Sequence, residues 1–336
     1  MNLTSSPLTL NLKTTFRVAH GASDQRHNVL ARIEFNGLTG YGEAAAVPYY
    51  GDTQQNLMAY IDAVPPLGEN PFALEDMLKS LPEGAHAAQA AIDIALHDLW
   101  GKLLGQPLYR LFGLTPAPLP KTSFTISIDV PDVMARAARE SGYPIIKVKL
   151  GPDDPEGAIA AIRSATNARL RVDANAGWTP QQALDLIPRL EKYNLEFIEQ
   201  PLPAGEVEAY RWLHRELKQK GVKLGIFADE SVKTAADVAQ YAGAIDGVVV
   251  KLMKTGGIRE ALRAIHTARA HGMEIMLSCM VESSVGVTAA AHLTPLCDYL
   301  DLDGPLLVAN DPFTGVQYDG ATLTLPDGPG LGVTPR

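Results

Sequence analysis

The chain has 336 residues, which allows one large domain or two domains and a sizeable buried core. Its apolar fraction of 46% and charged fraction of 20% are ordinary for a globular protein, and its net charge of -9 argues against a general nucleic-acid-binding role. Two cysteines imply no disulfide framework, and the N-terminus lacks the basic start and apolar run of a signal peptide. We therefore expect a cytoplasmic protein with no nucleic-acid partner and no membrane span.

Residues 1–115 are predicted to form an α+β unit. Turn residues such as Asn36-Gly37 separate short β-rich runs, which favours a small antiparallel sheet. These runs span 8–12, 29–35 and 39–43. A helix is predicted over 85–104, where strong helix formers place apolar residues at helical spacing and Gly105 follows.

Beyond this unit, short strands alternate with helices. Eight strand-like runs are predicted, at 122–128, 145–150, 170–173, 197–199, 224–228, 247–251, 274–278 and 299–302. Helical stretches between them include 155–164, 180–192 and 258–271. The intervals are about one strand plus one returning helix, the cadence of a (β/α) barrel. We expect a barrel domain over 116–314, with the tail at about 315–336 returning to the N-terminal unit.

Charged residues end several of these strands. In a (β/α) barrel the C-terminal ends of the strands meet at one mouth, so such residues would form a single site. Asp173, Glu199 and Asp229 end three consecutive strands, and an all-carboxylate site suits Mg²⁺. The alternative is a structural role, since Asp is common where a strand turns into a helix. Glu230 should point away from the metal and could instead orient a lysine.

Lysines flank the carboxylates. Lys147 and Lys149 lie two residues apart in a strand and so share one face, where mutual repulsion would lower a lysine pKa towards that of a base. Solvated lysines at a strand end are the alternative. Lys251 is expected across the barrel from Lys149, and a base on each side of a carbon is what inversion of that carbon requires. Lys254, in the following loop, is expected to face solvent.

Asp301 and Asp303 also share one face of a strand. Their natural partner would be a cation on the substrate, such as an ammonium group. They could instead neutralise the lysines.

These residues together resemble the enolase superfamily, in its muconate-lactonizing subgroup, and within it the dipeptide epimerases. The motifs are IKVKLG, VDANAGW, IEQPL, ADES, VKLMKTGG and DLDGP, at 146–151, 172–178, 198–202, 228–231, 250–257 and 301–305. The resemblance covers essentially the whole chain. It implies an α/β fold, a modified (β/α)7β TIM-type barrel with an N-terminal α+β capping domain that the C-terminal segment completes.

The resemblance also implies which residues bind the metal and move protons. One Mg²⁺ per subunit would be held by Asp173, Glu199 and Asp229, and it would stabilise the ene-diolate that forms when the proton next to a carboxylate is removed. Lys149 and Lys251 would be the paired acid/base catalysts.

Four residues are implied to contact the substrate: Thr125, Lys147, Asp301 and Asp303. Lys147 would help to hold the substrate carboxylate and lower its neighbour's pKa, and the aspartate pair would hold the free α-ammonium group of a dipeptide. Related lactonizing and dehydrating enzymes generally lack this pair. The implied function is therefore a Mg²⁺-dependent dipeptide epimerase that inverts the α-carbon of the C-terminal residue, and we expect a homo-oligomer.

Loops of the capping domain at 16–28 and 44–53 are expected to close over the substrate. In Ala-Glu epimerases an arginine of the first loop pairs with the substrate glutamate, whereas a gapless alignment places Gly21 there. We therefore expect an enzyme that is not specific for Ala-Glu. Hydrophobic or other side chains are expected in the second residue of the substrate, and Asp24 and Asp52 also allow a cationic one. The candidates for an apolar pocket wall are His20, Tyr49 and Tyr50, which could also be surface loop residues.

Three other functions stay open. A cycloisomerase or an o-succinylbenzoate synthase on the same scaffold would form the same type of enolate and then eliminate. A Schiff-base aldolase would use one lysine to attack a carbonyl. A catalytically inactive binding protein is the third.

Overall fold

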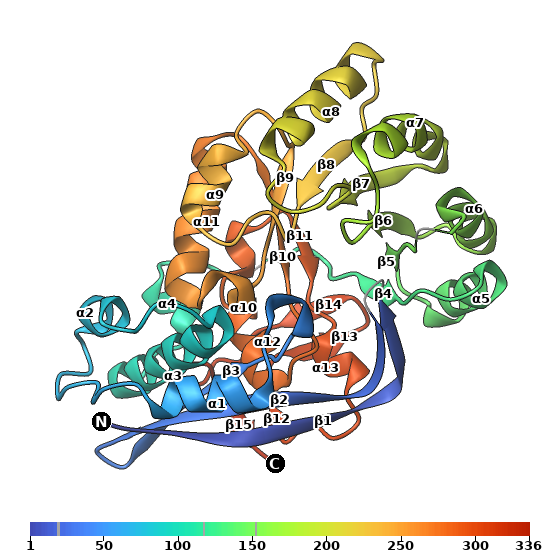
Figure 1. Ribbon diagram of the computed structural model, residues 1–336. Coiled ribbons are helices and arrows are strands. Elements are labelled where there is room, and N and C mark those ends of the chain that lie inside the picture. Colours follow the sequence, from blue (N-terminus) through green and yellow to red (C-terminus); the bar gives the residue numbers. More distant parts are fainter. Residues whose placement is uncertain (19–20, 117, 152) are drawn as a thin grey trace.

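The computed structural model describes residues 1–18, 21–116, 118–151 and 153–336. An antiparallel sheet with helices at the N-terminus lies against one side of an eight-stranded parallel barrel (Figure 1). This arrangement confirms the α/β fold class, a barrel with an N-terminal α+β cap.

The cap is built on a three-stranded sheet in the order β1-β2-β3, with β1 at Asn2–Val18, β2 at Gly21–Phe35 and β3 at Leu38–Ala44. Asn36 and Gly37 form the two-residue turn between β2 and β3, and both have positive φ, as a type I′ hairpin requires. The strands β1 and β2 are longer than predicted. Mostly polar or exposed residues continue their pairing as far as Val18 and Gly21, where hydrophobic alternation gives no signal.

Two helices pack on this sheet, α1 (Gln54–Asp62) and α3 (His86–Leu104). The shorter α2 (Leu74–Lys79) and α4 (Leu108–Leu111) pack against α3, and η1 (Pro48–Tyr50) precedes α1. The long helix α3 confirms the predicted one, and Gly105 ends it in the left-handed conformation. It packs closely on β3, because a Cβ at Gly42 would lie 1.9 Å from the carbonyl oxygen of Ala91. Only glycine at that position allows the approach.

All eight predicted barrel strands are present. They are β4 (Phe124–Ile126), β5 (Ile145–Lys149), β6 (Arg169–Asp173), β7 (Leu195–Glu199), β8 (Gly225–Ala228), β9 (Gly247–Val250), β10 (Glu274–Ser278) and β11 (Tyr299–Asp301). Each pairs in parallel with its neighbours in the sequence. A parallel bridge between Thr122 and Leu300 brings the first and last strands together, so the barrel is nearly closed.

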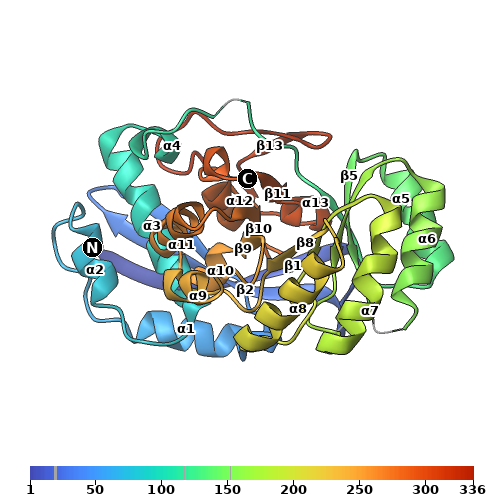
Figure 2. The same ribbon diagram turned by 90° about the horizontal axis from the view of Figure 1, so that it is seen from above.

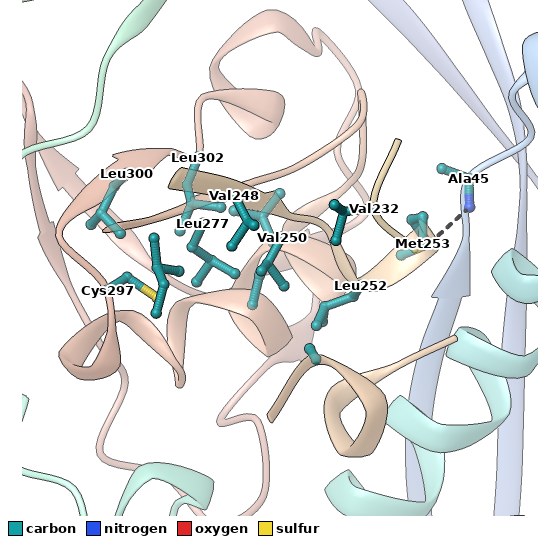
Figure 3. Packing of buried hydrophobic residues seen from close by; sticks show 14 of the residues in the cluster. Ala45, Val232, Val248, Val250, Leu252, Met253, Leu277, Cys297, Leu300 and Leu302 are labelled. Atoms are coloured by element: carbon teal, nitrogen blue, oxygen red, sulfur yellow. Dashed lines mark hydrogen bonds between the residues drawn. The ribbon is translucent and has the colours of Figure 1, made fainter. Parts of the chain in front are cut away.

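Helices surround the barrel (Figure 2). In chain order they are α5 (Pro131–Ser141), α6 (Pro155–Ala165), α7 (Pro180–Leu190), η2 (Glu191–Tyr193), α8 (Val207–Gln219), α9 (Ala235–Gln240), α10 (Leu252–Thr255), α11 (Ile258–Ala270), α12 (Ser284–Ala291), η3 (Thr294–Leu296) and α13 (Gly304–Leu307). Buried apolar side chains of β9, β10 and β11 pack beneath them, among them Val248, Leu277 and Leu300 (Figure 3). The barrel is thus a packed core, and the space for a ligand lies at its mouth.

The tail contains four short strands: β12 (Phe313–Thr314), β13 (Gln317–Asp319), β14 (Thr322–Thr324) and β15 (Thr334–Pro335). Its contacts with the cap include hydrogen bonds of two backbone groups. The Leu331 N–H donates to Asp98 Oδ1 at 2.8 Å, and the Gly330 carbonyl accepts from the Leu108 N–H at 3.1 Å. The domain boundaries 1–115, 116–314 and 315–336 stay a prediction. Within the described ranges, the helices are too short or too polar to cross a membrane.

Candidate active site

A cavity of about 500 Å³ lies where the C-terminal ends of the barrel strands face the cap loops. This volume is within the range of small-molecule sites. Six residues predicted from the sequence to bind substrate or move protons line it: Thr125, Lys147, Lys149, Lys251, Asp301 and Asp303. The structure therefore brings residues that are far apart in the sequence into one site.

Strand register sets the layout of this cavity. Lys149 of β5 is paired with Asp173 of β6, which is paired with Glu199 of β7, so three charged groups form one row at the mouth. Lys251 directly follows β9, which stands four steps from β5 in the eight-stranded order. Four of eight steps is half the circumference. Lys251 and Lys149 therefore approach the cavity from opposite sides, as predicted.

The three acidic residues at the base of the site are almost completely buried, and each pairs with lysine. Lys149 Nζ lies 2.8 Å from Asp173 Oδ2, and Lys251 Nζ lies 2.5 Å from Asp229 Oδ2. Burial opposes the charged form, but the nearby ammonium groups outweigh it and lower the pKa of both Asp173 and Asp229. Both residues are therefore carboxylates at neutral pH.

Lys147 is the central cation of the site. Its Nζ lies 2.9 Å from Glu199 Oε1, 3.0 Å from Asp301 Oδ2 and 3.4 Å from Asp173 Oδ2. Burial would lower the pKa of Lys147, but the charges of these three acids raise it well above its usual value. Burial likewise opposes the charged form of Lys251, but the charge of Asp229 raises the pKa of Lys251 above its usual value.

The predicted lowering of a lysine pKa by like-charge repulsion is therefore wrong for Lys147. The prediction considered the neighbouring ammonium group of Lys149 and left out the carboxylates of Glu199 and Asp301, which lie within 3.0 Å of Lys147 Nζ.

The three acids include one carboxylate oxygen that is free to bind a metal ion. Lys147 Nζ is 2.8 Å from Glu199 Oε2, but without hydrogen-bond geometry, so Oε2 is a buried oxygen with no hydrogen-bond partner. Such an orphaned oxygen beside Asp173 and Asp229 suits a hard cation. In the described part of the chain no three acidic, His or Cys side chains lie close enough together to enclose an ion. Glu199, Asp173 and Asp229 instead form ion pairs with Lys147, Lys149 and Lys251, respectively. The donor set fits Mg²⁺, and the assignment stays a proposal.

The two predicted aspartates beyond β11 have different surroundings. Asp301 accepts from Ser123 Oγ at 2.7 Å, from Ser278 Oγ at 2.9 Å and from Lys147. Burial opposes ionisation, but the charge of Lys147 and these hydrogen bonds lower the pKa of Asp301 to about 2. Asp303 accepts from the Thr125 N–H at 2.7 Å, and burial together with the charge of Asp301 raises its pKa to about 7. Of the two aspartates, Asp301 therefore fits the alternative role of neutralising a lysine, here Lys147.

The position predicted for Lys254 is wrong. It was expected in solvent, but it is buried and donates to the carbonyl oxygens of Val232 at 3.2 Å and Val249 at 3.0 Å and to both the backbone and the side chain of Asp229. The reason is α10, a single helical turn that starts directly after β9 and directs Lys254 back beneath the mouth. A short turn of this kind leaves no periodic signal in the sequence.

Asn175 is a site residue that the sequence reasoning missed. It lines the cavity, and its Oδ1 accepts from Lys149 at 3.2 Å. Its φ of 45° is left-handed, a conformation that asparagine tolerates better than most residues. The sequence feature that could have identified Asn175 as a site residue is its position two residues after Asp173. Glu230 also lines the cavity; β8 ends at Ala228, so strand alternation does not decide its direction.

The cap loops contribute the other wall. Tyr49 and Tyr50 both line the cavity, which supports a pocket wall over a purely superficial role. Lys233 Nζ lies 5.0 Å from the ring centre of Tyr50, and Asp52 also faces the cavity. The predicted role of His20 lies outside the described residues.

The fold and the site define a class: a capped α/β barrel with acid/base side chains from opposite strands around a set of buried carboxylates. Two family models match the chain, "Mandelate racemase / muconate lactonizing enzyme, N-terminal domain" over residues 5–113 and "Enolase C-terminal domain-like" over residues 130–336. The chain belongs to the enolase superfamily, in the mandelate racemase/muconate lactonizing enzyme subgroup. The resemblance inferred from the sequence is thereby confirmed.

Several relatives in this subgroup are epimerases. The chain is 42% identical to an L-Ala-D/L-Glu epimerase of Bacteroides thetaiotaomicron over 99% of its own length and 88% of the relative's. It is 36% identical to a hydrophobic dipeptide epimerase of Roseobacter litoralis, covering 96% of each. The structure of a dipeptide epimerase from Enterococcus faecalis V583, complexed with Mg and L-Leu-L-Tyr, matches with a TM-score of 0.91 at 33% identity over 99% of this chain and 98% of that one.

Proposed function

We propose that this protein is a Mg²⁺-dependent dipeptide epimerase that inverts the α-carbon of the C-terminal residue by moving protons between two lysines. The observation that carries the proposal is the position of Lys149 and Lys251 on opposite sides of one cavity. The dipeptide class is supported by the relatives in the same subgroup.

In this proposal Asp173, Glu199 and Asp229 hold one Mg²⁺ per subunit, with its other coordination positions left to water and substrate. The ion would supply positive charge beside the substrate carboxylate, which makes the adjacent α-proton easier to remove.

The chain's own residues bind the substrate and move the proton. Lys147, the central cation, faces the substrate carboxylate, and Thr125 lines the wall next to Asp303. One of Lys149 and Lys251 takes the α-proton with its neutral amine, and the ammonium of the other delivers a proton to the opposite face. The product carries the inverted carbon, and the two lysines exchange protonation states.

The pair Asp301 and Asp303 favours a dipeptide epimerase over the main alternative, an eliminating enzyme on the same scaffold. A dipeptide has a free α-ammonium group that an anionic pair can bind, whereas the anionic substrate of a cycloisomerase or an o-succinylbenzoate synthase would be repelled. A Schiff-base aldolase would use one lysine to attack a substrate carbonyl, and borohydride trapping with substrate would reveal the resulting adduct. The epimerase is therefore favoured.

The side chain of the epimerised residue faces the cap loops. Ala46, Val47, Tyr49, Met280 and Val281 give the cavity a wall that is largely apolar. This supports a preference beyond Ala-Glu, with hydrophobic side chains accepted. A homo-oligomer remains part of the proposal and can be tested by light scattering.

The deciding experiment is to incubate a dipeptide library with the protein and Mg²⁺ in D₂O and to record by mass spectrometry which members gain one deuterium. Incorporation at the C-terminal residue is expected for a subset with a free N-terminus, and chelation by EDTA should stop it. If no member of the library exchanges, the proposal is wrong.

A further inference from the structure

We infer that Asn28 and Glu43 form a buried junction that fixes the position of the substrate pocket wall, and that the two residues act as positioning residues for substrate binding. Neither residue lines the cavity. The inference rests on the proposed function for its kinetic test, and it has a second test that is independent of activity.

Glu43 links the cap to the barrel. It lies on β3, is fully buried, and both of its carboxylate oxygens accept hydrogen bonds from the start of α12. The donors are the Ser283 N–H at 3.0 Å, the Ser283 Oγ at 2.5 Å and the Gly286 N–H at 3.2 Å. Ser283 is the N-cap of α12 and in turn accepts from the Val285 N–H. A carboxylate of the cap thus completes the N-terminus of a barrel helix.

Asn28 extends the junction to three other segments. Its Nδ2 donates to Glu43 Oε1 at 2.8 Å and to the Val281 carbonyl at 3.1 Å, and its Oδ1 accepts from the Ala46 N–H at 3.3 Å. Its backbone carbonyl accepts from Gln54 Nε2 at 2.7 Å. The Val281 carbonyl can only accept and the Ala46 N–H can only donate, so these two contacts fix the orientation of the Asn28 amide.

The segments held by this junction are the ones that form the pocket wall. Ala46, Gln54 and Val281 line the cavity together with their neighbours Val47, Cys279 and Met280. A nearby contact, from the Ala45 N–H to Met253 Sδ at 3.4 Å, joins the same cap loop to α10 (Figure 3). The lysines, in contrast, stand on β5 and at the end of β9. Loosening the junction should therefore displace the wall and leave the lysines in place.

Two isosteric substitutions disturb the junction without changing its volume. Glu43→Gln introduces an amide N–H₂ that must face either the Ser283 and Gly286 N–H groups or the Asn28 amide, so two donors oppose each other. Asn28→Asp places a second carboxylate against Glu43 and an acceptor against the Val281 carbonyl. The double variant Glu43→Gln/Asn28→Asp restores one hydrogen bond, because the new amide can donate to the new carboxylate while its oxygen still accepts from α12.

The kinetic test measures how much of each variant's effect falls on KM and how much on kcat, with the dipeptide that the wild type converts best. Each single variant should raise KM at least 10-fold with kcat within 3-fold of the wild type, and the double variant should recover at least half of the change in log KM. A purely structural role would lower the active fraction, so that kcat per total protein falls and KM stays constant. That result, or a double variant no better than the worse single one, would overturn the inference.

The second test reads the wall directly, through thiol labelling. Cys279 lines the cavity and is half-buried, whereas Cys297 is buried elsewhere in the barrel. In native buffer, the rate of Cys279 alkylation should rise at least 10-fold in both single variants while Cys297 stays unlabelled. Parallel labelling of both cysteines would indicate general unfolding, and an unchanged Cys279 rate would show that the wall has not moved; either contradicts the inference.

Two control variants calibrate both tests. Glu34→Gln makes the same chemical change at an exposed position of β2, and Ile33→Ala destabilises the cap core away from the pocket. Both should leave KM and Cys279 labelling at wild-type values, although Ile33→Ala should lower Tm. If wild-type protein exchanges no dipeptide, the proposed function fails, and the labelling comparison still decides the junction.

Discussion

Lys147 Nζ lies 3.0 Å from Asp301 Oδ2 and joins β5 to β11, which stand two strands apart at the mouth of the barrel. Asp301 uses its other oxygen to accept from Ser123, so both of its oxygens are engaged. Asp303, two residues on, accepts from Thr125 and takes part in none of the ion pairs found among the described residues. The two aspartates therefore have different roles in our proposal: Asp301 holds Lys147, and Asp303 would bind the substrate ammonium group.

This division of roles predicts different consequences for the two Asn variants. Asp303→Asn should lower kcat/KM for dipeptides by about 10- to 100-fold, mainly through KM, since a hydrogen bond to a charged group contributes about 1.5–3 kcal/mol. Asp301→Asn should also destabilise the fold by roughly 3–5 kcal/mol, because it leaves Lys147 buried with one partner fewer. Steady-state kinetics and urea unfolding of both variants check this, with exposed Asp319→Asn as the control. Equal destabilisation by the two variants would contradict the division.

The raised pKa of Asp303 gives the reaction a pH dependence. Only the carboxylate form attracts an ammonium group, so substrate capture requires Asp303 to be ionised, which occurs above its pKa of about 7. We expect kcat/KM to fall about tenfold per pH unit below pH 7 and to level off above it. Asp303→Asn should abolish this acidic limb. If the limb persists unchanged in the variant, another group is responsible.

Lys254 should contribute strongly to stability. Its buried ammonium group compensates the charge of Asp229, so Lys254→Met should lower the unfolding free energy by about 3–5 kcal/mol. Guanidinium denaturation measures the loss, and Lys220→Met, at an exposed position, is the matched control with no expected effect. A loss similar to that of the control would show that Lys254 is not needed to hold Asp229.

The sequence was sufficient for the barrel and for six of the residues that line the cavity. Six of the eight strands end in a charged residue or are followed directly by one, and parallel strands must bring such ends together. The position of Lys149 opposite Lys251 follows from counting strands alone. These predictions succeeded because they depend on period and order, which local sequence encodes.

Charge states and side-chain partners could not be predicted in the same way. The raised pKa of Lys147 depends on Asp301, 154 residues away, and burial of Lys254 depends on a single turn of helix. The junction of Asn28 with Glu43 likewise joins two cap strands to a loop more than 200 residues later. Such effects arise only when tertiary contacts set distances between charges and donors.

The buried His292 predicts how stability changes with pH. Its Nδ1 accepts from the Tyr109 N–H at 3.3 Å and its Nε2 donates to the Leu331 carbonyl at 3.1 Å, so the ring is neutral, and burial lowers its pKa to about 4. The unfolded chain, with a pKa near 6.5, binds the proton more readily. The stability that the neutral ring of His292 contributes is therefore fully present above pH 6.5. This contribution decreases by about 1.4 kcal/mol per pH unit as the pH falls towards 4.

Urea unfolding between pH 7.5 and 4.5 measures this loss. The variant His292→Gln, which keeps a donor for Leu331, should show a shallower pH dependence than the wild type. An identical pH dependence in both proteins would assign the effect to other groups.

The most direct test of the central claim is stereospecific exchange in D₂O with the variants Lys149→Met and Lys251→Met, each given the two epimers of one dipeptide substrate separately. Neither variant should interconvert the epimers. Each should still exchange the α-proton of a single epimer, and the epimer should be the opposite one in the two variants, because each remaining lysine reaches only one face of the carbon. If both variants exchange the same epimer, or if either still epimerises, Lys149 and Lys251 do not act from opposite faces.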